Sequence, residues 1–117
     1  MRTAVGLSST AEELAKWIVA LQRGKLLTGA GSLETLWTPG TLLDGSTGGF
    51  SDFLNGYALG FPIVARREHR AIAAVGGARS ALFIYPDDDM AVVILTNLQG
   101  AFPESFIDEV ARVARGE

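Results

Sequence analysis

Apolar positions at helical spacing define the first element of the chain. Four of them recur at i, i+3, i+4 and i+7 and so share one face of a helix: Leu14, Trp17, Ile18 and Leu21. Thr10 and Glu13 fit a capping box, in which each side chain accepts a hydrogen bond from a free backbone N–H, and Gly24 is a typical C-terminal stop. The pattern predicts a helix over residues 11–23, with Trp17 packed in the core.

A second apolar stripe lies near the end of the chain. It consists of Phe106, Ile107, Val110 and Val113. Pro103 suits the first turn of a helix. Arg112 and Arg115 place positive charge in the last turn, where the helix dipole favours it. We expect a helix over residues 102–115.

Between these helices the helical spacing gives way to loop and strand signals. A short helix is expected near residues 32–37, and Pro39 ends it. Residues 40–56 hold five glycines and predict a long loop. Apolar runs bounded by turn residues then predict strands over residues 57–65, 70–75, 80–85 and 90–96.

The run from Met90 to Thr96 does not alternate between apolar and polar residues, so we expect it to be buried on both faces. The element order predicts an α+β fold, with an antiparallel sheet of three to four strands flanked by an N-terminal and a C-terminal helix. We assign residues 1–117 to a single domain. Its parts are a helical segment (1–39), a loop (40–56), the sheet (57–97) and the C-terminal helix (102–115).

Composition narrows the range of partners. The 117 residues are 48% hydrophobic and 20% charged, with a formal net charge of −3, so neither nucleic acid nor an acidic membrane surface is expected. The absence of cysteine excludes disulfides and thiolate metal sites. No apolar run reaches the roughly 20 residues that span a bilayer. A polar stretch follows Met1 and Arg2 and argues against a signal peptide, which places the chain in the cytoplasm if it is the native product.

Several polar residues allow a chemical and an ordinary structural interpretation. His69 could act as a general base for Ser80 or Ser51, but its charged neighbours favour a solvated turn. The carboxylates of residues 87–89 could bind a hard cation, but their spacing matches no calcium loop and favours a turn between two strands. No metal site is predicted.

The arginines and the second tryptophan leave other options open. Arg66, Arg67 and Arg70 cluster at one expected turn, where solvated charge is usual. Arg79 directly follows two glycines and a small residue, and it could meet a substrate carboxylate. Trp37 either lines a ligand pocket or packs in the core.

Three segments, taken in order, resemble one protein family. Residues 6–27 are similar to its "GL-x-ST-x-x-DLA" helix and the "G-x-LL" segment that follows. Residues 56–61, GYALGF, are similar to its "YGLGW" strand, and residues 75–97 to "H-x-GG…YP-x-x-x-x-x-VVVLTN". Through these segments the chain resembles the carboxy-terminal portion of serine β-lactamases and penicillin-binding proteins, most closely the class C β-lactamase-like esterases and peptidases.

That resemblance implies a serine acyl-transfer site without a cofactor. A Ser-x-x-Lys pair supplies the nucleophile and its activating amine, and a Tyr-x-Asn element assists proton transfer; neither motif occurs in this chain. A Lys/His-x-Gly strand motif lines the site, and the N–H after its glycine helps to form the oxyanion hole. It aligns with Ala74, Val75 and Gly76, where Ala74 replaces the polar residue, and Gly77 could present the oxyanion N–H.

The missing motifs leave three hypotheses for this partial β-lactamase/transpeptidase-like fold. The chain is a C-terminal hydrolase fragment, inactive alone, whose nucleophile lies upstream; or a non-catalytic ligand-binding module; or a structural subunit that completes its sheet with another polypeptide. By resemblance, the strand from Met90 to Thr96 lacks its family partner and should be a bare apolar edge. We expect a homo-oligomer formed through that edge or by exchange of the helix at residues 11–23.

Overall fold

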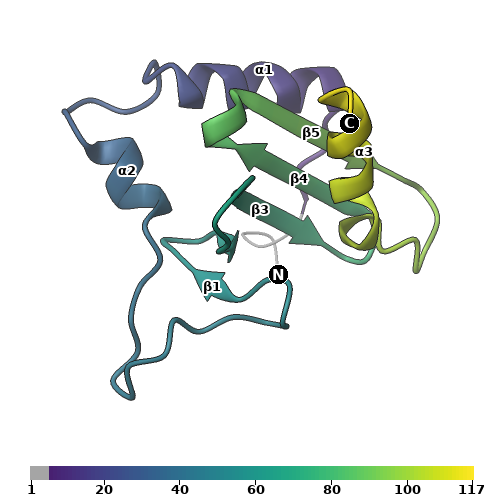
Figure 1. The fold of residues 1–117 in the computed structure, drawn as a ribbon. Coiled ribbons are helices and arrows are strands. Elements are labelled where there is room, and N and C mark those ends of the chain that lie inside the picture. The colour runs from purple at the N-terminus through teal and green to yellow at the C-terminus, as the bar shows by residue number, and fades with distance from the viewer. Residues whose placement is uncertain (1–5) are drawn as a thin grey trace.

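The computed structural model describes residues 6–117 and consists of a five-stranded antiparallel sheet with helices packed on it (Figure 1). Each strand pairs with the next one along the chain, in the order β1-β2-β3-β4-β5. In sequence order the elements are α1 (Ala11–Gln22), α2 (Ser32–Trp37), β1 (Gly56–Tyr57), β2 (Pro62–Val64), β3 (Ala71–Gly76), β4 (Ser80–Tyr85), the 3₁₀ turn η1 (Pro86–Asp88), β5 (Met90–Leu95), the 3₁₀ turn η2 (Pro103–Ser105) and α3 (Ile107–Ala114).

The α+β class is confirmed, and the sheet has one strand more than the three to four predicted. The run expected as one strand over residues 57–65 divides into β1 and β2. The division occurs because the Ala58 N–H donates to the Phe61 carbonyl at 2.8 Å and Gly60 has a φ of +84°, which together reverse the chain. Strand β4 has the predicted bounds, and no helix or strand interrupts residues 40–55, as expected of a loop.

The first helix begins and ends where its capping signals predict. The Thr10 hydroxyl accepts a hydrogen bond from the Glu13 N–H at 3.2 Å. Gly24, with a φ of +67°, lets the chain leave the helix while the Lys25 N–H donates back to the Ala20 carbonyl at 2.9 Å. Ile18 is fully buried against the sheet.

The burial of the two tryptophans differs from what was expected for Trp17 and decides between the two options for Trp37. Trp17, predicted in the core, is 43% exposed, whereas Trp37 is 6% exposed and packs in the core. Ile18 and Leu21 take the sheet-facing positions of α1, and Trp17 is left on the flank of the apolar stripe.

The sheet has an apolar layer on each face. Ile72 and Ile84 are paired across β3 and β4 and pack with Ile18 of α1. Phe83 and Tyr85 point to the opposite face, where α3 lies together with residues of the loop before β1. Successive side chains of a strand point to opposite faces, so β3 and β4 separate the two layers.

Strand β5 is the free edge of the sheet. Among residues 6–117 it pairs with β4 alone, through the register Leu82↔Val93 and Phe83↔Val92. Its side chains are partly exposed, which corrects the expectation of burial on both faces. Helix α1 packs toward one face and α3 toward the other (Figure 1), but the open edge admits solvent.

The C-terminal helix is shorter than predicted and rotated relative to its expected stripe. Pro103 starts a separate 3₁₀ turn, and α3 begins at Ile107. Ile107 and Ala111 are fully buried, whereas Val110 is 42% and Val113 is 67% exposed. Of the predicted stripe only Ile107 faces the sheet, because the buried face of α3 follows Ile107 and Ala111, four residues apart, and this turns Val110 and Val113 toward solvent.

Candidate functional site

The segment with the strand motif ends β3 and enters a tight turn. The Arg79 N–H donates to the Gly76 carbonyl at 3.1 Å, and the two residues between them, Gly77 and Ala78, have φ values of +58° and +54°. Two successive positive φ values are characteristic of the tight turn that best fits the twist of a hairpin. Gly77 adopts this conformation without cost, whereas Ala78 is strained.

A cavity of about 540 Å³ lies between this hairpin and the N-terminal half of α1. Its wall on the sheet includes Ala74, Val75, Gly76 and Leu82, and Trp17 contributes from the helix. The remaining lining residues are Leu7, Ser9, Leu14, Ser80, Ala81 and Leu95. The lining contains no ionisable side chain, so its chemistry is that of an apolar pocket with two hydroxyl groups.

The predicted site residues fall into two groups around this cavity. Ala74, Val75 and Gly76 are on its wall, while Gly77 and Arg79 lie in the exposed turn beyond it. A Cβ added to Gly77 would meet no atom within 4 Å, whereas one on Gly76 would approach the Ser80 hydroxyl to 3.2 Å. The strand therefore packs closely at Gly76 and is open at Gly77.

The two hydroxyl groups of the cavity are engaged with backbone. Ser80 donates to the Gly76 carbonyl at 3.1 Å, and Ser9 donates to the Thr10 carbonyl at 3.4 Å. Within residues 6–117 neither hydroxyl is hydrogen-bonded to a lysine or a histidine. Both therefore lack the adjacent base that activates a serine nucleophile.

His69 lies at the far end of the sheet from this cavity. It precedes β3, whereas Ser80 is paired with Gly76 at the opposite end of the β3–β4 hairpin. Its Nδ1 lies 2.8 Å from the Asp88 carboxylate. His69 therefore lies in the turn between β2 and β3, as expected, with the added contact to Asp88 that η1 brings beside it. A general-base role toward Ser80 has no geometry to support it.

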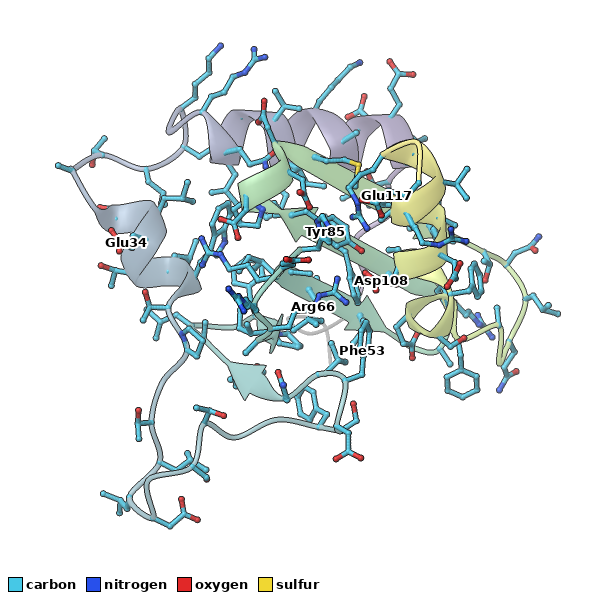
Figure 2. The ribbon with its side chains drawn as sticks, in the orientation of Figure 1. Glu34, Phe53, Arg66, Tyr85, Asp108 and Glu117 are labelled. Carbon is cyan, nitrogen blue, oxygen red and sulfur yellow. The ribbon has the colours of Figure 1, made fainter. Side chains whose placement is uncertain are left out.

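A cluster of charged and aromatic groups fixes α3 to the sheet. Arg66 donates from both terminal nitrogens to Asp108, at 2.8 and 2.7 Å, and the Tyr85 hydroxyl donates to the same carboxylate at 3.0 Å. Figure 2 shows Arg66, Tyr85 and Asp108 converging in front of the strands. Arg115 lies over the Tyr85 ring, 5.6 Å from its centroid.

This cluster shifts the ionisation of its members. The hydrogen bonds from Arg66 hold the pKa of Asp108 below its ordinary value of 3.8. Burial, and then the charge of Asp108, raise the pKa of Tyr85 well above its ordinary value of 10.0. Both shifts favour the pair seen in the structure, a charged carboxylate beside a neutral phenol.

The turn arginines and most of the aspartates are exposed, as the sequence predicts, but several of them also form ion pairs. Three ion pairs are formed. Arg66 pairs with Asp108, Arg70 pairs with Asp87 at 3.0 Å, and His69 pairs with Asp88. Asp87 and Asp88 are therefore paired with basic side chains. In the described part of the chain no three histidine or acidic side chains cluster as metal ligands would. Likewise, none of the helices in this part has the length and apolar character to cross a membrane.

The family of the chain follows from comparison with known families. A model of the family described as Beta-lactamase matches residues 1–116, and the chain belongs to this family. No match was found among curated proteins or among solved structures. The match spans all three segments that carry the sequence resemblance, and it includes the cavity between α1 and the β3–β4 hairpin.

Proposed function

We propose that this chain supplies the sheet-side wall of a β-lactamase-like acyl-transfer site and is inactive by itself. The observation that carries the proposal is a cavity against the glycine-bearing strand whose wall holds no activated nucleophile. The Ser-x-x-Lys and Tyr-x-Asn motifs are absent from all 117 residues. The nucleophile and its base would come from a polypeptide segment outside this sequence.

The chemistry that remains is stabilisation of negative charge. Acyl transfer turns a substrate carbonyl oxygen into an oxyanion, and backbone N–H groups stabilise it when they point at that position. Gly76 is part of the wall, and Gly77, the next residue in sequence, is the first exposed residue of the turn. A single such donor contributes about 2.7–4 kcal/mol to the transition state, which cannot start a reaction that has no attacking group.

A hydrolysis assay and mass spectrometry test the proposal that the chain is inactive by itself. Purified chain is incubated with nitrocefin and with a p-nitrophenyl ester. Gly77→Pro is the comparison variant: it removes the N–H in question, and it also disrupts the turn because proline cannot adopt the φ of +58° found there. We expect both proteins to give the rate of buffer alone and no mass increase after exposure to penicillin. Turnover by the chain well above the Gly77→Pro control, or a covalent adduct on Ser9 or Ser80, would refute the proposal.

A complementation assay tests whether the chain contributes the wall of a working acyl-transfer site. A separate polypeptide from a β-lactamase-family protein that carries Ser-x-x-Lys and Tyr-x-Asn is added to the chain. We expect turnover that requires both polypeptides and falls by about 10²–10³-fold with Gly77→Pro. Turnover that is insensitive to the presence of the chain would contradict a contribution from this wall. Sequencing upstream of the native gene for the two motifs identifies the natural source.

The apolar cavity also favours a second function, binding of an acyl or peptide ligand without turnover. A volume of about 540 Å³ with apolar walls is typical of small-molecule sites. A thermal-shift screen with β-lactams and D-alanyl peptides tests this function, with Ala74→Trp as the variant that fills the cavity. A ligand that raises the melting temperature of the wild type and not of Ala74→Trp would support it. Equal shifts would exclude this cavity as the binding site.

A further inference from the structure

The cavity between α1 and the β3–β4 hairpin offers little that could hold a charged group. Its lining includes no lysine, arginine, histidine, aspartate or glutamate. The hydroxyls of Ser9 and Ser80 both give their protons to backbone carbonyls, and the indole N–H of Trp17 is the remaining side-chain donor of the lining. A carboxylate needs several donors or a cation to replace its water. It would therefore be left largely unpaired in this cavity.

The strand position that could place a cation in the wall is occupied by Ala74. Ala74 is paired with Leu82 across β3 and β4, and both belong to the apolar layer beneath α1. Two basic side chains are close in sequence to lining residues but lie outside the lining. Lys16 is on the exposed side of α1, 2.9 Å from Glu12, and Arg79 is exposed in the turn. The wall is consequently apolar at the position where a strand could present a cation to an anionic ligand.

Apolar side chains around the cavity remain open to solvent. Trp17, Val75 and Leu95 are 43%, 37% and 40% exposed. They come from α1, β3 and β5 and line the same cavity. Single exposed apolar residues are ordinary, but several around one hollow are typical of a binding site. A ligand with an apolar part would remove this surface from water, and that burial favours binding.

We propose that the cavity selects uncharged acyl or aryl ligands against carboxylates, and that Ala74 is the residue that sets this preference. The inference rests on the second function proposed above, ligand binding in this cavity, and narrows it. An uncharged amide or ester buries its apolar tail against Trp17, Val75 and Leu95 and leaves no charge unpaired. A carboxylate with the same tail gives up its water without an ionic partner in return. β-Lactams and D-alanyl peptides carry a carboxylate and should be poor ligands.

Two ligands with the same tail test the preference on the full chain. Octanamide and octanoate have nearly the same size and shape, and only octanoate is charged at pH 7. Binding is followed by calorimetry with the wild type and by the emission of Trp17 in the Trp37→Phe variant. We expect the dissociation constant of octanamide to be at least about tenfold lower than that of octanoate. Equal constants would overturn the charge preference and leave the binding function intact, whereas no binding of either ligand would overturn both.

Substitution of Ala74 tests whether this residue sets the preference. Ala74→Lys should lower the dissociation constant of octanoate about tenfold and raise that of octanamide, because a cation then stands in the wall. Ala74→Met is the matched control, since methionine is also long and unbranched but carries no charge, and it should weaken both ligands alike. Circular dichroism checks the fold of each variant, and the wild-type comparison of the two ligands stands without them. If folded Ala74→Lys and Ala74→Met behave alike, residue 74 does not set the preference.

Arg79→Gln separates selection by the wall from an ionic contact at the turn. Arg79 is exposed and outside the lining, so its substitution should leave both dissociation constants unchanged. A loss of octanoate binding in this variant would place the carboxylate at the turn, and would overturn the inference that the cavity excludes it.

Discussion

Arg66 and Asp108 are 42 positions apart in the sequence and meet in a two-pronged ion pair, with both nitrogen–oxygen distances at or below 2.8 Å. Arg66 follows β2 and Asp108 lies in the first turn of α3. The Tyr85 hydroxyl shares the carboxylate, so three elements are joined at one group. A planar guanidinium suits this geometry because its two N–H groups match the two carboxylate oxygens.

Asp108→Asn should destabilise the fold. It removes the charge that Arg66 and Tyr85 share, and hydrogen bonds to charged groups contribute about 1.5–3 kcal/mol. Because both side chains remain about a third exposed, solvent weakens the interaction, and we expect a loss of about 1–2 kcal/mol in the free energy of unfolding. Urea denaturation at pH 7 measures it.

Glu109→Gln is the matched control for this variant. Glu109 neighbours Asp108 on α3 and, among residues 6–117, forms its one ion pair with Arg112, at 2.8 Å and on an exposed face. Its loss should cost less than about 0.5 kcal/mol. Equal effects of the two variants would show that the cluster contributes nothing beyond ordinary surface charge.

The lowered pKa of Asp108 predicts a dependence of stability on acid. The unfolded chain takes up a proton at Asp108 near the ordinary value of 3.8, whereas the folded chain does so only at lower pH. The contribution is therefore fully present well above pH 3.8 and is lost as the pH falls through the lower, folded value. Urea denaturation from pH 6 to pH 2.5 should show the difference between wild type and Asp108→Asn narrowing in acid. A constant difference over that range would exclude the ion pair as its cause.

The sequence predicted the elements that depend on local signals. Helix α1 has a cap at Thr10 and a stop at Gly24, and β4 has turn residues on both sides, so their bounds follow from short-range chemistry. The division of residues 57–65 was missed, since the positive φ of Gly60 depends on the Ala58–Phe61 hydrogen bond rather than on composition. The burial of Trp37 was left undecided because it depends on which face α2 presents to the sheet.

The polar cluster could not be predicted from the sequence for a different reason. Asp108 appears as an ordinary acid in the first turn of a helix, and Arg66 as one of several turn arginines. Their meeting depends on how α3 lies across the sheet, which is set by the packing of Ile107 and Ala111. By contrast, the segment Ala74 to Gly76 could be singled out from the family resemblance because it is contiguous in sequence; it lines the cavity, and its part in a reaction stays a prediction.

Gly49→Ala should be costly because the loop before β1 folds closely on itself. A Cβ at Gly49 would lie 2.5 Å from the Leu54 carbonyl oxygen and 2.7 Å from the Asn55 carbonyl carbon. Backbone on both sides must then move, and we expect a loss of about 2–3 kcal/mol in the free energy of unfolding. The Phe50 N–H, which donates to the Leu54 carbonyl at 2.8 Å, should exchange faster with solvent deuterium.

Gly45→Ala is the control variant for Gly49→Ala. Gly45 lies in the same loop with a φ of +85°, but a Cβ there meets nothing within 4 Å. Only the backbone strain of a positive φ remains, about 1 kcal/mol. If Gly45→Ala costs as much as Gly49→Ala, the close approach of the loop to Leu54 is not what makes glycine necessary.

The contrast between the two tryptophans can be measured by fluorescence quenching with acrylamide. Trp37→Phe leaves Trp17 as the only indole, at the wall of the cavity and 43% exposed, whereas Trp17→Phe leaves Trp37, which is 6% exposed. Collisional quenching requires contact with the ring, so the quenching constant should be several-fold larger for the Trp17 reporter. Its emission should also lie at longer wavelength, since part of the ring is hydrated. Similar constants for the two variants would mean that Trp17 is covered, and the cavity beside Gly76 would then be closed to ligands.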